Sequence, residues 1–126
     1  MFLKRSLLVV AFLSTQLYSG VKEINSLSTF TSTISSGVSV VKFYMDSCPP
    51  CKASAPMFSS LSNDSKYSSV NFITVNFQRG RALASKYARA FPTFVFFKDG
   101  KVTGSKIIGY DGRTKTQISS RLDGLL

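Results

Sequence analysis

Histidine and tryptophan are absent from this chain of 126 residues, and cysteine occurs only twice, at Cys48 and Cys51. A structural zinc site usually needs four cysteine or histidine ligands. A single copy of the chain cannot supply that set, so only a dimer that shares a metal ion or an iron–sulfur cluster could build such a site. We therefore expect no metal site and no cofactor.

Long apolar runs are missing as well. The run at residues 7–13 follows Lys4 and Arg5 and is followed by a polar, small-residue stretch. This layout is typical of a secretory signal peptide, and the run is shorter than the about 20 apolar residues that a transmembrane helix needs. We predict a signal peptide over residues 1–20 and a protein located outside the cytoplasm, either periplasmic or secreted. An uncleaved membrane anchor is the alternative, because the cleavage region includes large residues.

Acidic residues are few: the chain has six, against 16 lysines and arginines, for a formal charge of +10. Without Lys4 and Arg5 the charge would be about +8, which makes acidic partners or an anionic surface plausible. The basic residues are scattered, however, and form no run that would mark a nucleic-acid stripe. We predict a solubilising basic surface and no nucleic-acid partner.

The hydrophobic pattern beyond residue 20 alternates between helical and extended periods, which predicts one α/β domain over residues 21–126. Residues 38–44 are apolar on both alternating faces except at Lys42, as expected for a strand in the middle of a sheet. Asp99 and Gly100 suit a tight hairpin turn. The remaining expected elements are helices at about 24–34, 51–61, 81–87 and near 118–125, and strands at 70–77 and on both sides of the hairpin turn.

The two cysteines lie in "DSCPPCKASAP", residues 46–56. As a structural staple this disulfide would be poor, since closing so short a loop contributes only about 2 kcal/mol. A redox pair explains the spacing better. If Cys48 caps a helix and Cys51 lies one turn further on, the sulfurs are within bonding reach and the helix N-terminus stabilises a Cys48 thiolate. Pro49 and Pro50 fit a first helical turn and stiffen it.

The stretches "VVKFYMDSCPPCKASAP" and "FPTFVFFKDGK" together resemble the thioredoxin family, and the resemblance covers about residues 21–126. It implies a thioredoxin fold, in which a central mixed β-sheet has helices on both faces. By the same resemblance, Cys48 is the attacking thiol and Cys51 the resolving thiol. Pro92 is then a cis-proline facing the pair, and Phe91, Pro92 and Thr93 form the substrate-binding segment.

Three positions depart from the usual family pattern. Ser47 stands where a tryptophan usually precedes the first cysteine, and Pro49 stands where glycine is usual. Lys42 stands where a buried aspartate is expected. Two interpretations of Lys42 are open: the side chain reaches water and has no role, or it is buried and supports the site by favouring thiolates or by accepting the proton of Cys51.

The resemblance implies a thiol–disulfide oxidoreductase that exchanges the Cys48–Cys51 pair with disulfides or thiols of protein substrates. We expect a monomeric reductase, because the chain lacks the inserted domain or dimerising region that oxidases and isomerases of this superfamily usually carry. A reductase needs an electron donor, which could be membrane-embedded. The alternatives are a non-enzymatic thioredoxin-like binding module and an oxidase or isomerase of the same fold.

Overall fold

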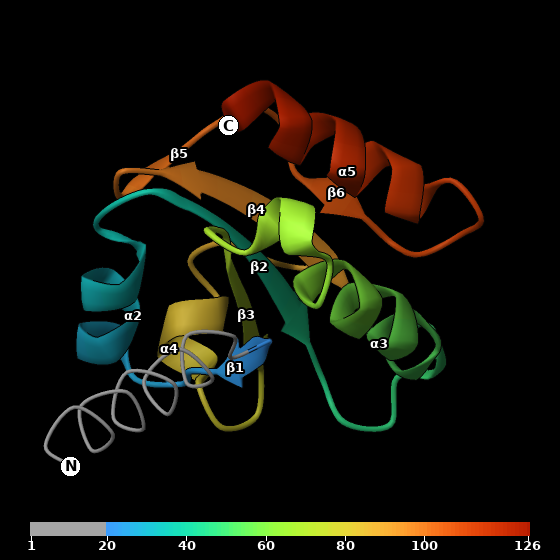
Figure 1. Cartoon of the computed structure of the whole chain (residues 1–126). Coiled ribbons are helices and arrows are strands. Elements are labelled where there is room, and N and C mark those ends of the chain that lie inside the picture. Colours follow the sequence, from blue (N-terminus) through green and yellow to red (C-terminus); the bar gives the residue numbers. More distant parts are fainter. Residues whose placement is uncertain (1–19) are drawn as a thin grey trace, which may run out of the picture.

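The computed structural model describes residues 20–126, which form a six-stranded mixed sheet with helices on both faces (Figure 1). The predicted signal peptide, apart from Gly20, lies outside the described residues. The strands are β1 (Val21–Glu23), β2 (Val38–Tyr44), β3 (Asn71–Asn76), β4 (Thr93–Lys98), β5 (Lys101–Val102) and β6 (Ile107–Ile108). The helices are α2 (Leu27–Ile34), α3 (Pro49–Ser62), the 3₁₀ turn η1 (Ser65–Tyr67), α4 (Arg81–Ala84) and α5 (Thr114–Leu125).

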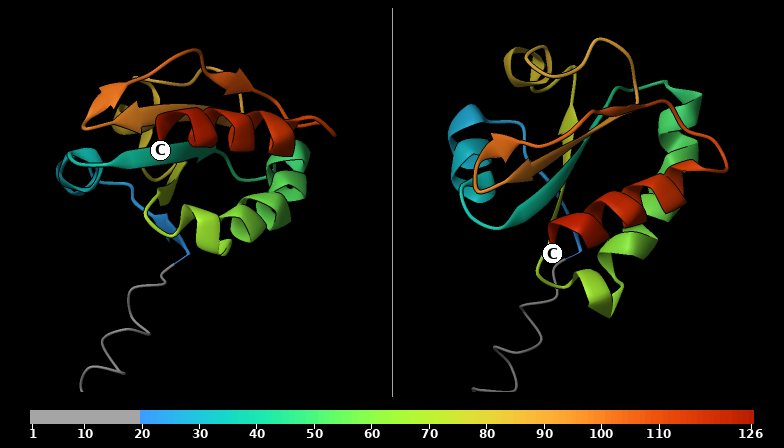
Figure 2. Two further views of the ribbon diagram at one scale, coloured as in Figure 1. Left: turned by 45° about the horizontal axis from the view of Figure 1, so that its top comes forward. Right: turned by 90° about the horizontal axis from the view of Figure 1, so that it is seen from above.

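Strand β2 lies in the middle of the sheet, as its two apolar faces predict. The strand order is β1-β3-β2-β4-β5, with β2 parallel to β3 and antiparallel to β4. Helices α3 and α5 cover one face, and α2 and α4 cover the other (Figure 2). Each face buries its own apolar cluster, and the predicted α/β class with a mixed, doubly covered sheet is confirmed.

The N-terminal region differs from its sequence-based description. The chain first forms the short edge strand β1, which was not predicted and which pairs with β3. Helix α2 begins only at Leu27, after the cap residue Ser26, whose hydroxyl accepts the Thr29 N–H. Ile24 is buried, but it belongs to the segment before the helix, where its N–H donates to the Thr74 carbonyl at 2.9 Å. Ile24 therefore matched the helical spacing of apolar residues although it lies outside the helix.

The hairpin after β4 turns at Asp99 and Gly100, which both have positive φ, as predicted. The strand that follows is broken into β5 and β6, which pair with opposite ends of β4. Residues 103–106 between them belong to no strand, and Gly104 there has a φ of 66°. Helix α4 is also shorter than predicted and ends at Ala84. Among the helices of residues 20–126, none is both long and apolar enough to cross a membrane.

Candidate active site

The cysteine pair occupies the first turn of α3, directly after the loop that follows β2. Cys48 is the N-cap residue, and its Sγ accepts the backbone N–H of Cys51 at 3.3 Å. The two residues form a disulfide with their Cα atoms 5.2 Å apart. Pro49 and Pro50 fill the first two helical positions and are exposed. The predicted local geometry, with one cysteine at the cap and the other one turn further on, is confirmed.

The loop before β4 lies against Cys48. The Phe91–Pro92 peptide bond is cis, as expected, and the Phe91 carbonyl oxygen is 3.7 Å from Cys48 Sγ. The Pro92 carbonyl accepts the Gly109 N–H at 2.8 Å. Thr93 is 1% exposed, and its hydroxyl donates to the Ala90 carbonyl at 2.7 Å. The Phe91 backbone thus lies beside the sulfur, whereas the Thr93 side chain braces the turn from inside.

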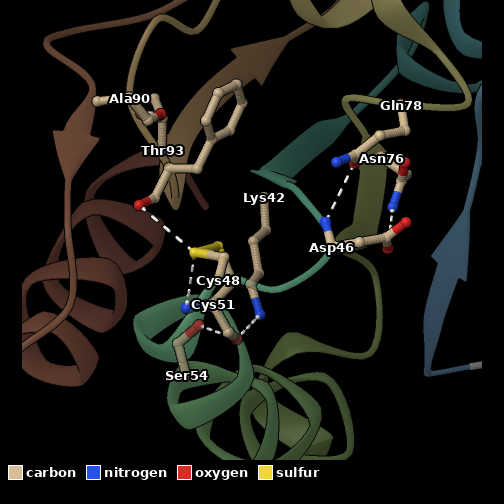
Figure 3. Close-up of a disulfide and its surroundings, with 10 residues drawn as sticks. Lys42, Asp46, Cys48, Cys51, Ser54, Asn76, Gln78, Ala90 and Thr93 are labelled. Atoms are coloured by element: carbon tan, nitrogen blue, oxygen red, sulfur yellow. Dashed lines mark hydrogen bonds between the residues drawn. A yellow bond between two sulfur atoms is a disulfide. The ribbon is translucent and has the colours of Figure 1, made fainter.

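Lys42 projects from β2 toward the first turn of α3 (Figure 3). It is only 4% exposed, so the interpretation that the side chain reaches water is wrong. Its Nζ donates to the backbone carbonyl of Cys51 at 2.9 Å, and the Ser54 hydroxyl donates to the same oxygen at 2.9 Å. Burial penalises the ammonium form and lowers the pKa of Lys42 to about 8.

An open cavity of about 510 Å³ adjoins this lysine. Its wall combines the end of β2, the loop at 45–47, the first turns of α3 and the facing position on β3. The lining includes Lys42, Cys51, Lys52 and Thr74, with Thr74 directly opposite Lys42 in the strand register. The resolving cysteine and the buried ammonium therefore share one cavity.

A buried amide fixes the loop that leads into Cys48, and the sequence analysis did not identify it. Asn76 ends β3 and is fully buried; its Nδ2 donates to Asp46 at 3.1 Å and its Oδ1 accepts the Arg79 N–H. The Asp46 N–H donates to the Gln78 side chain at 3.1 Å. The sequence signal for Asn76 was a polar side chain at a position that should be buried in an otherwise apolar strand, because a buried polar group needs hydrogen-bond partners.

The hydroxyl of Tyr44 is engaged at the edge of the sheet. It donates to the Glu23 carboxylate and accepts from Arg79 at 3.3 Å. Partial burial and the hydrogen bond to Glu23 raise the pKa of Tyr44, so the phenol is neutral at neutral pH. Partial burial also works against ionisation of Glu23, but hydrogen bonds from Tyr44 and Asn25 and the charge of Arg79 outweigh it and lower the pKa of Glu23.

The low pKa of Lys42 makes stability depend on pH. An unfolded lysine keeps its proton to about pH 10.4, so between about pH 8 and that value the unfolded chain binds more protons and stability rises with pH. The destabilisation is fully present below about pH 8. From about pH 7 to about pH 10 the oxidised protein should gain roughly 1–2 kcal/mol relative to Lys42→Met, less than the full shift would give because water in the open cavity screens the charge, as measured by urea unfolding at each pH.

The oxidised form is used for this measurement because its cysteines do not titrate. Lys52→Met, which removes an exposed lysine next to Cys51, is the matched control and should keep the pH dependence of the wild type. Parallel stability curves for the wild type and Lys42→Met would contradict a buried, destabilised ammonium.

Comparisons with known proteins agree with this geometry. The sequence matches the Thioredoxin family over residues 21–124. A thioredoxin-like protein of Fusarium culmorum is 42% identical over 92 residues, which cover 68% of this chain and 76% of the relative. The thioredoxin of Equus caballus is 34% identical over 110 residues, which cover 84% and 99%. The structure of Malassezia sympodialis thioredoxin superposes with a TM-score of 0.73 at 29% identity, over 85% and 92% of the two chains. The chain therefore belongs to the thioredoxin family of thiol–disulfide oxidoreductases.

Proposed function

We propose that the protein is a monomeric reductase of protein disulfides outside the cytoplasm, with Cys48 as the attacking thiol and Cys51 as the resolving thiol. The observation that carries the proposal is the position of Cys48 at the N-cap of α3, where its sulfur accepts a helix N–H. Unpaired amides and the helix dipole stabilise a thiolate at that place. The nucleophile of thiol exchange is the thiolate.

The exchange of the cysteine pair with a substrate disulfide proceeds in two steps. In the first, the Cys48 thiolate attacks one sulfur of a substrate disulfide, and the other substrate sulfur leaves as a thiolate and takes up a proton. In the second, Cys51 loses its proton and attacks Cys48 Sγ, which releases the second substrate thiol and leaves the Cys48–Cys51 disulfide. Two electrons pass to the substrate. A donor must then return two electrons to the protein, and we propose a membrane-embedded one.

The loop before β4 supports the role of Cys48 as the entry point. The Phe91 carbonyl lies beside its sulfur, and Pro92 offers no N–H that would need an internal partner. An extended substrate segment can therefore pair with the backbone of Phe91 next to the reacting sulfur. The exposed rings of Pro49 and Pro50 complete this surface on the helix side.

Lys42 is proposed as a positioning residue for the second step. Its buried ammonium is bonded to the carbonyl of Cys51, and a positive charge so close to this residue favours ionisation of the resolving thiol. With its pKa lowered to about 8, the neutral amine is also accessible as a proton acceptor near neutral pH. Attack by Cys51, more than attack by Cys48, should depend on this side chain.

The proposed location outside the cytoplasm rests on the N-terminal sequence, where Lys4 and Arg5 precede the apolar run at 7–13. The first strand of the fold begins at Val21. Cleavage near Gly20 would therefore leave β1 and the rest of the sheet whole. The reductase direction is supported by the uninterrupted fold, because no domain is inserted between the elements of residues 20–126.

The order of attack can be tested by trapping. Cys51→Ser should accumulate stable mixed disulfides with a disulfide-containing protein substrate, because Cys48 still attacks and nothing resolves the bond quickly. Cys48→Ser should accumulate far fewer. Non-reducing electrophoresis and mass spectrometry of the adducts measure both. If Cys48→Ser is the variant that traps substrate, the two roles are reversed.

The role of Lys42 can be separated from simple stability by timing the two steps. Lys42→Met should raise the pKa of at least one thiol and slow the resolution of a preformed mixed disulfide by about tenfold or more, with a smaller effect on its formation. Lys42→Asp restores the usual family residue and should stay active. Stopped-flow exchange and thiolate absorbance give these quantities. Unchanged thiol titration and unchanged rates in Lys42→Met would leave the lysine without a part in the reaction.

One experiment on the native cell can test both the location of the protein and the direction in which it exchanges electrons with its substrates. Fractionation followed by immediate thiol alkylation should find the protein outside the cytoplasm, with Cys48 and Cys51 mostly reduced. A predominantly oxidised pair would indicate an oxidase. Retention in the cytoplasm, with residues 1–20 still attached, would overturn the proposed location. Replacement of Lys4 and Arg5 by glutamate, which reverses the charge before the apolar run, is the matched control and should reduce export.

A further inference from the structure

The buried ammonium of Lys42 lacks an acidic partner among residues 20–126. Ion pairs in this part of the chain join other residues, and Lys42 Nζ donates its hydrogen bond to the neutral backbone carbonyl of Cys51. Lys42 is only 4% exposed, and a buried charge is destabilised without an opposite charge. An ammonium has three donor hydrogens, so after the hydrogen bond to this one carbonyl it can still donate to other acceptors.

The acid closest in sequence is held elsewhere. Asp46 lines the same cavity, but its carboxylate accepts from Asn76 at 3.1 Å and lies 3.7 Å from Arg79. In Figure 3 the Asp46 carboxylate points toward Asn76, whereas the Lys42 ammonium points toward Cys51. The positive charge of Lys42 and that of Lys52, on the same lining, are therefore not balanced from within the cavity.

We propose that the cavity beside Cys51 is a binding site for a small free carboxylate that pairs with Lys42, and that its occupancy is linked to the redox state of the cysteine pair. The cavity has about 510 Å³, which is ample for a compact organic anion. Ser47 and Thr74, which carry hydroxyls, and the apolar residues Met45 and Ala55 also line the cavity. This inference rests on the proposed redox function, because it concerns control of the same pair.

The linkage follows from competition for one charge. In the reduced protein the negative charge of the Cys48 thiolate, at the cap of the same helical turn, partly balances the Lys42 ammonium and repels a carboxylate, whereas the disulfide of the oxidised protein is neutral and leaves the charge to the carboxylate. The anion therefore binds the oxidised form more tightly, and by reciprocity it favours that form and lowers the reduction potential. Protein substrates do not compete for this site, because Cys48 meets them beside Phe91, and Lys42 approaches Cys51 from the side of Asp46 (Figure 3).

Acetate serves as the probe. The full domain, oxidised and reduced in turn, is titrated with sodium acetate against sodium chloride at constant ionic strength, and backbone amide resonances of Ser47 and Thr74 are followed. Acetate should shift these resonances saturably and bind the oxidised form about fivefold or more tightly than the reduced form, the lower end of ordinary coupling between two sites. Equal affinity for the two forms overturns the linkage.

Two variants assign the binding to Lys42. Lys42→Met and Lys42→Gln should both lose the saturable shift. Glutamine keeps a donor for the Cys51 carbonyl, so a folded amide spectrum of Lys42→Gln shows that the loss does not come from a packing defect. Lys101→Met removes an exposed charge on β5 and should bind acetate as the wild type does. Saturable binding that survives in both Lys42 variants overturns the site. The binding is measured without turnover, so a protein that fails to reduce disulfides but binds acetate contradicts the proposed function alone.

Discussion

Lys42 Nζ and the carbonyl oxygen of Cys51 lie 2.9 Å apart, and this contact joins the central strand to the first turn of the cysteine helix. Strand β2 is held on both sides, by β3 and by β4, so the base of the lysine is fixed by the most deeply buried part of the sheet. Helix α3 is held in turn by Phe58, which packs against Phe72 and Phe94 of the neighbouring strands. The charge of Lys42 and the backbone of Cys51 therefore meet at a position that the fold allows to vary little.

This rigidity extends to the loop between the strand and the cysteines. Ser47 has a φ of 56°, in the left-handed region that non-glycine residues rarely occupy. The residue before it is bonded at its N–H by Gln78 and at its carboxylate by Asn76. A short loop held at two points can keep such a conformation. The result is that Cys48 enters the helix as its cap, with its sulfur directed at the helix amides and at the Phe91 carbonyl.

Much of this arrangement could be predicted from the sequence, because its signals are local. The period of residues 38–44, the Cys-Pro-Pro-Cys spacing and the Asp99–Gly100 turn each specify one element, and the structure has each of them. The parts that were missed depend on distant partners. Strand β1 has three residues and exists only by pairing with β3, and Asn76 becomes a hub only because Asp46 and Asn25 come to it from distant segments. The direction of the Lys42 side chain also depends on a partner in another element, the carbonyl of Cys51.

The reversed charge at position 42 changes how proton transfer can be coupled to exchange. A carboxylate in this position can accept a proton but opposes the formation of a neighbouring thiolate, whereas an ammonium favours the thiolate but must be neutral to accept a proton. Both demands are met if the ammonium and the neutral amine are both accessible near neutral pH. Burial lowers the pKa of Lys42 to about 8, which makes the neutral amine accessible there. Burial of the lysine, which weakens the fold, is thus the property that makes the charge-reversed site workable.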